Sequence, residues 1–281
     1  IDNYDNKYTY SDFYLSALKL IKYLDGKSVK TNSKILIIKE NSFDYLIILY
    51  ACLLGGYVAC PIDPTLKKEK IIELKKLYKI DYTIESIDKI DYKNCKADSN
   101  LVKYENTDCL IIGSSGTTGD PKGILFSSDS ILSSAQSFSQ LAKYNDKTKI
   151  LHCLPMFYMG GILDTFFACM YSGSTIILGK RFSINNVLNF WELPIKHKCN
   201  TLFLTPSIVA FLCAIYKKPK SEIKKHVNGY QSIIATGSYL YTEVRESFYK
   251  IFKKNIFACY GATELVGPLT LQNEEDTFED F

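Results

Sequence analysis

Short apolar runs alternate with amphipathic stretches from the start of the chain. Lys34–Ile38 is rich in β-branched residues, which is typical of a buried strand. Ser42 or Asp44 can cap a helix that runs to about Leu54, with Gly55 as its left-handed terminator. This first pair of elements predicts a strand followed by a buried helix.

The same alternation continues downstream. Tyr57–Ile62 and Ile80–Ile84 are strand candidates, and Lys67–Lys79 between them has the pattern of an amphipathic helix. Three apolar residues of that helix are predicted on its buried side: Ile71, Leu74 and Leu77. The resulting β-α-β-α-β order predicts parallel strands joined by helical crossovers.

The second half of the chain repeats this rhythm. The strand candidates are Ile150–Leu154, Thr175–Leu178, Thr201–Thr205, Ser232–Ala235 and Ile256–Tyr260. The helix candidates are Gly161–Tyr171, Ile184–His197, Pro206–Tyr216 and Glu243–Phe252. Ser183 and Thr242 are candidate N-caps, and Pro206 suits a first helical turn. The fold class is therefore α/β.

Composition narrows the possible partners. With 281 residues, 47% hydrophobic and 23% charged, the chain has an ordinary globular composition. Its net charge of +4 is too small and too dispersed to indicate nucleic acid. Lysines cluster in the predicted helix Lys67–Lys79, but acidic residues interrupt them at helical spacing, so a solvated helix face is the better interpretation.

Cysteines and apolar segments indicate the compartment. The nine cysteines include no Cys-x-x-Cys pair, which favours free thiols in a reducing environment. No signal peptide is visible at Ile1, and the most apolar run, Leu46–Cys60, is too short to span a membrane. We therefore expect a cytoplasmic protein without a membrane span and, with only three histidines, without a zinc site.

One segment has the chemistry of a phosphate-binding loop. Ser114–Gly123 lies between strand candidates Cys109–Ile112 and Gly123–Ser127. Glycines allow backbone N–H groups to converge on an anion, and Lys122 adds a positive charge. The residues expected to hold phosphate are Ser114, Ser115, Gly116, Thr117, Thr118, Gly119 and Lys122.

Two other interpretations of this segment are weaker. A polar surface turn would contain the same residue types, but it would rarely combine this glycine spacing with a Pro-Lys-Gly exit. A P-loop requires Gly-Lys-Ser/Thr, whereas Pro121 precedes Lys122 here and Gly123 follows it.

Ser114–Gly123 resembles, residue by residue, the signature loop of the adenylate-forming superfamily, which includes acyl-CoA and aryl-CoA synthetases, luciferases and nonribosomal-peptide adenylation domains. The resemblance implies two interleaved lobes of mainly parallel sheets with helices on both faces. We expect lobe one over about 34–147 and lobe two over about 1–33 plus 148–281. The nucleotide would lie between the lobes, at the carboxyl ends of strands.

A second motif supports this resemblance. Tyr260-Gly261-Ala262-Thr263-Glu264 is similar to the family's Tyr-Gly-x-Thr-Glu motif, which implies that Tyr260 stacks on adenine, Thr263 contacts the α-phosphate and Glu264 binds Mg²⁺. Gly261 lies within the same site. The implied catalytic residues are Lys122, Thr263 and Glu264.

A third segment corresponds to the family's adenine pocket. Thr236–Leu240 stands in place of its Gly-Gly-Ala-Pro-Leu segment and matches it at Gly237 and Leu240. Gly237 is expected to approach the adenine ring through its backbone, with Ser238 beside it.

The acid-binding segment departs from the family pattern. Leu154–Gly161 resembles the Pro-x-[Phe/Tyr]-His-x-x-Gly segment of CoA ligases, but Tyr158 stands where many members have His. The resemblance implies acid contacts from Phe157, Tyr158, Gly160 and Gly161; a buried aromatic cluster is an equally good interpretation. The segment lacks the Phe-Asp pattern of amino-acid-activating domains, which favours an acid without an α-amine.

The resemblance covers about Tyr8 to Leu271. The family's ribose-binding aspartate, hinge and C-terminal lysine would follow Phe281, so we expect the N-terminal domain only, with impaired catalysis on its own. The expected activity is ATP- and Mg²⁺-dependent activation of a carboxylic acid, followed by transfer to CoA. Transfer to an acyl or peptidyl carrier protein, or a non-catalytic nucleotide-binding module, are the alternatives.

Overall fold

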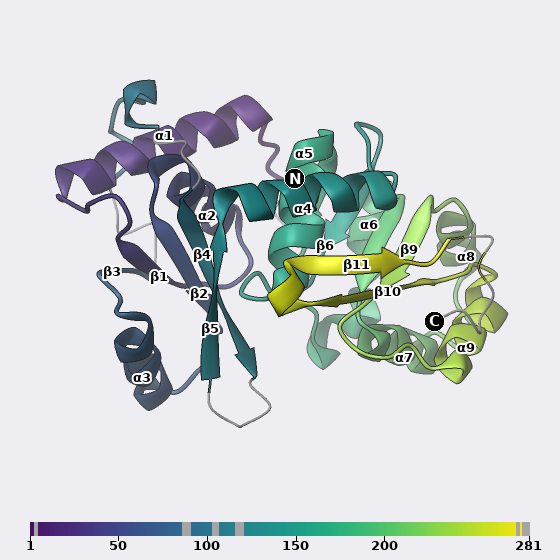
Figure 1. Ribbon diagram of the computed structural model, residues 1–281. Helices are drawn as coiled ribbons and strands as arrows, with labels where there is room; N and C mark the ends of the chain where they lie inside the picture. Colours follow the sequence, from purple (N-terminus) through teal and green to yellow (C-terminus); the bar gives the residue numbers. More distant parts are fainter. Residues whose placement is uncertain (3–4, 86–90, 103–106, 116–120, 274–275, 277–281) are drawn as a thin grey trace. The chain divides into compact units, whose positions relative to one another are not determined.

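A computed structural model describes residues 1–2, 5–85, 91–102, 107–115, 121–273 and 276 (Figure 1). The contacts divide the chain into two compact units. The first unit is Asp5–Ile131, and the second unit is Ile1–Tyr4 together with Leu132–Phe281. Each unit has its own sheet, and each sheet is mainly parallel, as the sequence predicted.

The first unit contains a five-stranded sheet in the order β3-β1-β2-β4-β5. Its strands are β1 (Lys34–Ile38), β2 (Val58–Ile62), β3 (Tyr82–Ile84), β4 (Asp108–Ser115) and β5 (Pro121–Ser127). All neighbours are parallel except β4 and β5, which pair antiparallel at the edge. Its helices are α1 (Tyr10–Gly26), α2 (Phe43–Gly55) and α3 (Lys68–Tyr78), with a 3₁₀ turn η2 (Ser99–Leu101).

Helix α2 begins and ends through side-chain and backbone caps. The Ser42 side chain accepts a hydrogen bond from the Tyr45 N–H, which confirms Ser42 as the N-cap. The left-handed terminator is Gly56, with φ 68°, and not Gly55, which is the last helical residue. The prediction was therefore wrong by one residue, because either glycine of the pair satisfies the same pattern.

Helix α3 buries a narrower face than the apolar pattern predicted. Leu74 and Tyr78 are buried, whereas Leu77 is 48% exposed. Leu77 lies about 100° from Tyr78 around the helix, and the aromatic ring takes the buried position. The prediction for Leu77 was wrong.

Helix α1 belongs to the first unit. Thr9 and Asp12 form a capping box at its start. The rings of Tyr8 and Phe43 stack with centroids 3.6 Å apart, and those of Phe13 and Tyr50 lie 4.9 Å apart. These contacts to α2 place residues 5–33 in the first unit, which differs from the lobe boundaries expected from the sequence.

Helix α4 (Ser128–Leu141) follows β5 directly and was not predicted by the apolar pattern. The division between the two units falls within it, after Ile131. Ser127 accepts a hydrogen bond from the Ser130 N–H at 3.2 Å and so caps its first turn.

The second unit contains a six-stranded sheet in the order β11-β10-β9-β8-β6-β7. Its strands are β6 (Lys149–His152), β7 (Thr175–Leu178), β8 (Thr201–Leu204), β9 (Ser232–Ala235), β10 (Phe257–Ala262) and β11 (Gly267–Leu271). Again all neighbours are parallel except the edge pair, β10 and β11. Each predicted strand of this half is present within two residues of its predicted bounds, and β11 is additional.

The helical segments of the second unit differ in type from the predictions. The predicted helix Gly161–Tyr171 is a π-helix η3 (Gly160–Phe167) continued by α5 (Ala168–Ser172), and Ile184–His197 is a 3₁₀ helix η4 (Ile184–Asn189) followed by α6 (Glu192–His197). The remaining helices are α7 (Pro206–Ile215), α8 (Ser221–Asn228), α9 (Thr242–Phe252) and the 3₁₀ turn η5 (Thr263–Leu265).

The caps of these helices were partly predicted. Ser183 caps η4 through a capping box, and Pro206 occupies the first turn of α7, as expected. Thr242 is the first residue of α9 and not its N-cap, because the non-helical residue before it is Tyr241.

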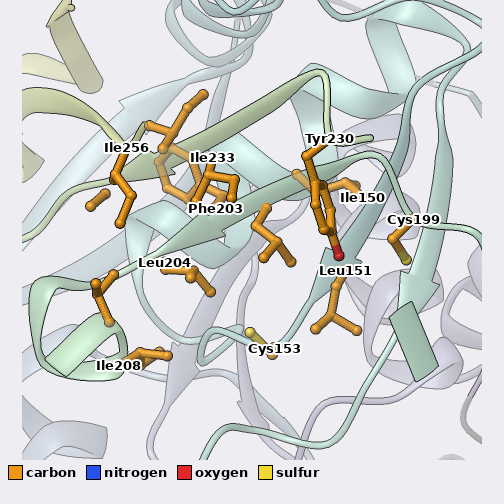
Figure 2. Packing of buried hydrophobic residues seen from close by; sticks show 14 of the residues in the cluster. Ile150, Leu151, Cys153, Cys199, Phe203, Leu204, Ile208, Tyr230, Ile233 and Ile256 are labelled. Carbon is orange, nitrogen blue, oxygen red and sulfur yellow. The ribbon is translucent and has the colours of Figure 1, made fainter. Parts of the chain in front are cut away.

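The core of the second unit lies between its sheet and its helices. Figure 2 shows Ile150 and Leu151 of β6, Phe203 and Leu204 of β8, and Ile233 of β9 within one cluster of buried side chains. These strand residues are at most 3% exposed. Near-continuous apolar strands of this kind are what a parallel sheet covered on both faces requires.

All nine cysteines are free, and eight are buried. The described residues contain no helix that is both long enough and apolar enough to span a bilayer.

Candidate functional site

The predicted phosphate loop is the end of an antiparallel hairpin. From the pair Leu110–Phe126, β4 and β5 stay in register up to the pairs Ser114–Lys122 and Ser115–Pro121. Five residues of the predicted loop lie outside the described residues: Gly116, Thr117, Thr118, Gly119 and Asp120. Ser114 and Lys122 are therefore brought opposite each other at the base of the loop.

Lys122 is exposed at this base. In the part of the chain that the structure describes, no carboxylate pairs with its ammonium group. An ammonium group in this position remains available to an anionic ligand.

Tyr78 of α3 crosses the same hairpin, a contact that the sequence did not reveal. A Cβ atom on Gly123 would lie 2.6 Å from Tyr78 Cε1, and one on Gly113 would lie 3.0 Å from Tyr78 Oη. Gly113 and Gly123 are partners in the ladder, so they leave a gap that the tyrosine ring fills. Burial raises the pKa of the Tyr78 hydroxyl, so it stays protonated.

The Tyr260–Glu264 motif lies on the edge hairpin of the second unit. Tyr260 and Gly261 end β10, and Thr263 and Glu264 form the 3₁₀ turn η5. The Tyr260 side chain is 60% exposed, and Glu264 is exposed as well. The ladder with β11 shifts register between Tyr260 and Gly261, an irregularity of the kind that is common beside functional sites.

The return of this hairpin is unusually tight. A Cβ atom on Gly261 would clash with the backbone oxygen of Gly267. Val266 has φ 61° and Gly267 has φ 104°, so the chain reverses through two residues of positive φ. For a β-branched residue such as Val266 this conformation is costly.

Gly237 follows β9 and lies against Tyr158. Its φ of 88° suits glycine, and a Cβ atom there would lie 3.1 Å from Tyr158 Oη. The neighbouring Thr236 hydroxyl donates a hydrogen bond of 2.9 Å to the Cys259 carbonyl of β10. Ser238 is exposed beside them. The predicted adenine segment and the predicted acid segment are therefore adjacent within the second unit.

The acid segment leads into the π-helix η3. The Arg181 guanidinium lies over the Phe157 ring, 5.6 Å from its centroid. Tyr158 is 36% exposed, whereas Gly160 and Gly161 are buried. A Cβ atom on Gly161 would clash with the Pro155 carbonyl oxygen. The backbone of this segment is thus tightly packed at Gly161. The side chains that the segment offers to a ligand are those of Phe157 and Tyr158.

His152, at the end of β6, anchors this segment. Its Nε2 lies 2.8 Å from the Gly161 carbonyl oxygen, and because a carbonyl only accepts, Nε2–H is the donor. Burial lowers the pKa of His152 to about 4, which keeps the ring neutral. The sequence carried no signal for this role.

Asp164 is a buried carboxyl within η3, also missed from the sequence. It is 3% exposed, and its Oδ1 has no hydrogen-bond partner among the described residues. Burial raises the pKa of this carboxyl well above its usual range. Its Oδ1 would lie 3.4 Å from a Cβ atom on Gly267, so η3 contacts the return of the β10–β11 hairpin.

The predicted residues of the second unit share one end of its sheet. Phe157–Gly161 follow β6, Gly237 and Ser238 follow β9, and Tyr260–Glu264 end or follow β10. The carboxyl ends of parallel strands are where α/β sheets bind ligands. Lys122, Ser114 and Ser115 are similarly gathered on the β4–β5 hairpin of the first unit.

Comparisons with known proteins agree on one family. Residues 1–280 match the family described as AMP-binding enzyme. The chain is 26% identical over 196 residues to a probable CoA ligase of Humulus lupulus, covering 64% of this chain and 32% of that protein. It is 26% identical over 216 residues to gramicidin S synthase 2 of Brevibacillus brevis, covering 71% of this chain and 5% of that protein.

A solved structure shows the same fold. ATP-bound MatB from Rhodopseudomonas palustris superposes with a TM-score of 0.84 at 14% identity. The match covers 98% of this chain and 58% of MatB, so the chain spans a little over half of that protein. Because the family model matches nearly the whole of this chain, the chain belongs to the AMP-binding, adenylate-forming enzymes.

Proposed function

We propose that the protein containing this chain uses ATP to convert a carboxylic acid into an acyl-adenylate and pyrophosphate, and then transfers the acyl group to the thiol of CoA. The observation that carries the proposal is the β10–β11 hairpin, which exposes Tyr260 and Glu264 at the carboxyl end of β10. An exposed aromatic ring and an exposed carboxylate four residues apart on one hairpin suit a metal-bound nucleotide.

The phosphate groups would be bound from the first unit. Lys122 and the loop residues Ser114, Ser115, Gly116, Thr117, Thr118 and Gly119 are the proposed ligands. The exposed Lys122 ammonium supports this, because no carboxylate among the described residues competes with phosphate oxygens for it. Holding the leaving pyrophosphate in line with the attacking carboxylate is the main contribution such a loop can make.

The nucleoside would be bound from the second unit. Tyr260 would stack on adenine, with Gly261, Gly237 and Ser238 approaching through backbone or hydroxyl groups and Thr263 contacting the α-phosphate. The positive φ of Gly237 and its freedom from a Cβ atom support a close backbone approach.

Mg²⁺ fits the donor set of this hairpin. The described residues contain no group of three carboxylate, histidine or cysteine side chains that could cage a metal, and Glu264 is a single exposed carboxylate. Mg²⁺ commonly binds one or two carboxylates and completes its shell with phosphate oxygens and water. Glu264 would hold the ion, which neutralises phosphate charge when bound.

The acid would lie along Phe157, Tyr158, Gly160 and Gly161. Tyr158 offers a hydroxyl beside Gly237, and burial raises its pKa, so it acts as a neutral hydrogen-bond donor. The histidine found here in many family members is replaced, and His152 lies behind the segment as a structural anchor.

The acceptor thiol is proposed as CoA on the strength of the CoA ligase relative. The similarity to gramicidin S synthase 2 keeps a carrier-protein phosphopantetheine as the alternative. Neither the fold nor the acid segment distinguishes the two, so a direct comparison of acceptors is required.

A pyrophosphate-release assay over a panel of carboxylic acids tests the proposal. The whole protein should release pyrophosphate with at least one acid, and Glu264→Gln should lower turnover by about 100-fold or more, because a group acting on transition-state charge is lost. Glu243→Gln, on the exposed first turn of α9, is the matched control. Turnover unchanged by Glu264→Gln would refute the metal assignment, and no acid-dependent release would support a non-catalytic module.

The 281 residues alone should bind ATP-Mg²⁺ weakly and adenylate poorly, since they span 58% of MatB. Calorimetry measures the binding, and robust pyrophosphate release by these residues alone would contradict the second expectation.

A further inference from the structure

The turn that carries Glu264 is followed by a strained residue. Val266 adopts φ 61°, a left-handed conformation that β-branched residues rarely occupy. Such a conformation is costly and persists only when neighbouring groups enforce it. The contacts that enforce it are therefore of interest.

One of those contacts is local. The Val266 N–H donates a hydrogen bond of 3.1 Å to the Thr263 carbonyl, which closes the 3₁₀ turn η5. This hydrogen bond closes the turn, but it does not by itself determine the direction in which the chain continues after Val266.

A second contact comes from far along the chain. The Ser134 hydroxyl of α4 donates a hydrogen bond of 2.7 Å to the Val266 carbonyl, across 132 residues. Leu163 and Asp164 of η3 pack against Gly267, the next residue. All of these residues belong to the second unit.

The Ser134 bond differs from those of other serines in α4. Ser130 and Ser139 donate to carbonyls of Ser127 and Gln136, three residues earlier, which is the usual behaviour of serine in helices. Ser134 instead directs its hydroxyl to the neighbouring hairpin. The Ser134 hydroxyl does not bond a carbonyl of its own helix but the carbonyl of the strained Val266. It is therefore placed to hold the peptide group that follows Val266 in one orientation.

We propose that Ser134 is a positioning residue for Glu264. Its hydrogen bond fixes the Val266 peptide plane, which keeps Val266 left-handed and so fixes the direction in which η5 presents the Glu264 carboxylate. The inference rests on the proposed function, because it gives Ser134 a role only if Glu264 holds the Mg²⁺ of the bound nucleotide.

A purely structural role would have a different signature. A serine that only stabilises packing would lower the unfolding temperature when replaced and leave the Mg²⁺ dependence of nucleotide binding unchanged. Replacing a positioning serine should instead weaken the Mg²⁺-dependent part of binding, because the Glu264 carboxylate is then free to sample other directions.

The test compares variants of the whole protein by calorimetric ATP titration over a series of Mg²⁺ concentrations. Ser134→Ala should lower the Mg²⁺-dependent gain in ATP affinity about 5- to 10-fold, as expected for one net hydrogen bond to a positioned group. Ser139→Ala, which loses one hydrogen bond in the same helix, should lower the unfolding temperature comparably and leave that gain unchanged.

A second pair guards against misfolding. Ser134→Thr and Ser134→Val are nearly isosteric and differ in the hydroxyl, so the threonine variant should retain the Mg²⁺-dependent gain and the valine variant should lose it. Hydrogen exchange without metal should be faster at the Val266 amide in Ser134→Val than in Ser134→Thr. Equal Mg²⁺ dependence in these two variants would overturn the proposal.

Glu264→Gln separates this inference from the proposed function. If Glu264→Gln abolishes the Mg²⁺-dependent gain and Ser134→Val does not, only the role of Ser134 is refuted. If Glu264→Gln leaves the gain unchanged, the metal assignment fails and the role of Ser134 fails with it.

Discussion

The two motifs proposed to bind nucleotide lie on antiparallel hairpins at the edges of otherwise parallel sheets, yet the two hairpins are built differently. In β4–β5 the register shift lies far from the loop, between Asp108 and Leu110, and the glycine pair Gly113–Gly123 makes room for the Tyr78 ring. In β10–β11 the ladder is broken by a register shift, and Gly261 makes room for the backbone of Gly267.

The difference indicates what each hairpin can tolerate. A glycine that faces a side chain can be replaced if the side chain moves, whereas a glycine that faces backbone cannot. The first hairpin ends at the segment proposed to bind phosphate, and the second holds the turn bearing Thr263 and Glu264. The second should therefore be the less tolerant of change.

Gly261→Ala is expected to cause the largest loss. Its Cβ would meet the Gly267 carbonyl, so the free energy of unfolding should fall by about 3 kcal/mol or more. Gly113→Ala, which meets only the Tyr78 hydroxyl at 3.0 Å, should cost about 1 kcal/mol or less. Urea unfolding measures both, and equal losses would break the contrast between the hairpins.

Acid should weaken the second unit through His152, which lies behind the acid segment. Its pKa falls from 6.5 in the unfolded chain to about 4 in the fold, so the unfolded state binds the proton more tightly. The stabilisation is complete above pH 6.5 and is lost as the pH falls toward 4, by about 3 kcal/mol in all.

The single tryptophan provides the measurement. Trp191 is buried in the second unit, so its fluorescence follows unfolding of that unit. The denaturation midpoint should decrease from pH 7 to pH 4, and less so in His152→Gln. An identical pH dependence in both proteins would contradict the assignment to His152.

The contact between Tyr78 and the first hairpin gives an intermediate effect. Gly123→Ala should cost about 2 kcal/mol because its Cβ would lie 2.6 Å from the tyrosine ring. Adding Tyr78→Leu should remove part of that cost, giving a coupling energy of about 1 kcal/mol in a double-mutant cycle. Strict additivity of the two changes would show that the ring does not fill the glycine gap.

The smallest effect is expected at single hydrogen bonds beside each hairpin. Thr236→Val removes the bond to the Cys259 carbonyl of β10 and should cost about 1 kcal/mol. Ser127→Ala removes the cap on α4 at the end of β5 and should also lower the free energy of unfolding by about 1 kcal/mol. Trp191 fluorescence should report the first loss directly, and its insensitivity to Thr236→Val would contradict the prediction.

Much of the fold was readable from the apolar pattern. Lys34–Ile38, Thr175–Leu178 and Ser232–Ala235 are strands with the predicted bounds, because buried parallel strands are continuous apolar runs bounded by polar residues. The helix type of 160–167 could not be predicted, because a π-helix shares the composition of an α-helix. Within it the Thr165 hydroxyl donates to the Gly160 and Gly161 carbonyls, contacts that the apolar pattern does not reveal.

Elements that lack an apolar stripe were missed. The sequence of α8 is mostly polar and charged, and only Ile223 and Val227 of this helix are buried. In β11 Leu269 is exposed, and only Gly267 is buried. Their positions depend on neighbours in space, such as β10 for β11. Local pattern carries no information about such neighbours.

The residues of the candidate site also fall into two groups, those that the sequence predicted and those that it did not. Lys122, Tyr260 and Glu264 were identified from motif resemblance, because their chemistry is recorded in residue type and spacing. His152 and Ser134 were not, because a histidine donating to a carbonyl and a serine bonding a residue 132 positions away depend on tertiary contacts.

The distribution of thiols has a practical consequence. Eight of the nine cysteines are buried, and burial raises the pKa of each of their thiols, while Cys95 is partly exposed on the segment 91–102. Thiolate and access together control reaction with alkylating reagents. A maleimide dye should therefore attach first to Cys95, which gives the unaltered protein one preferred labelling position, remote in sequence from both hairpin motifs, for following ligand-linked motion.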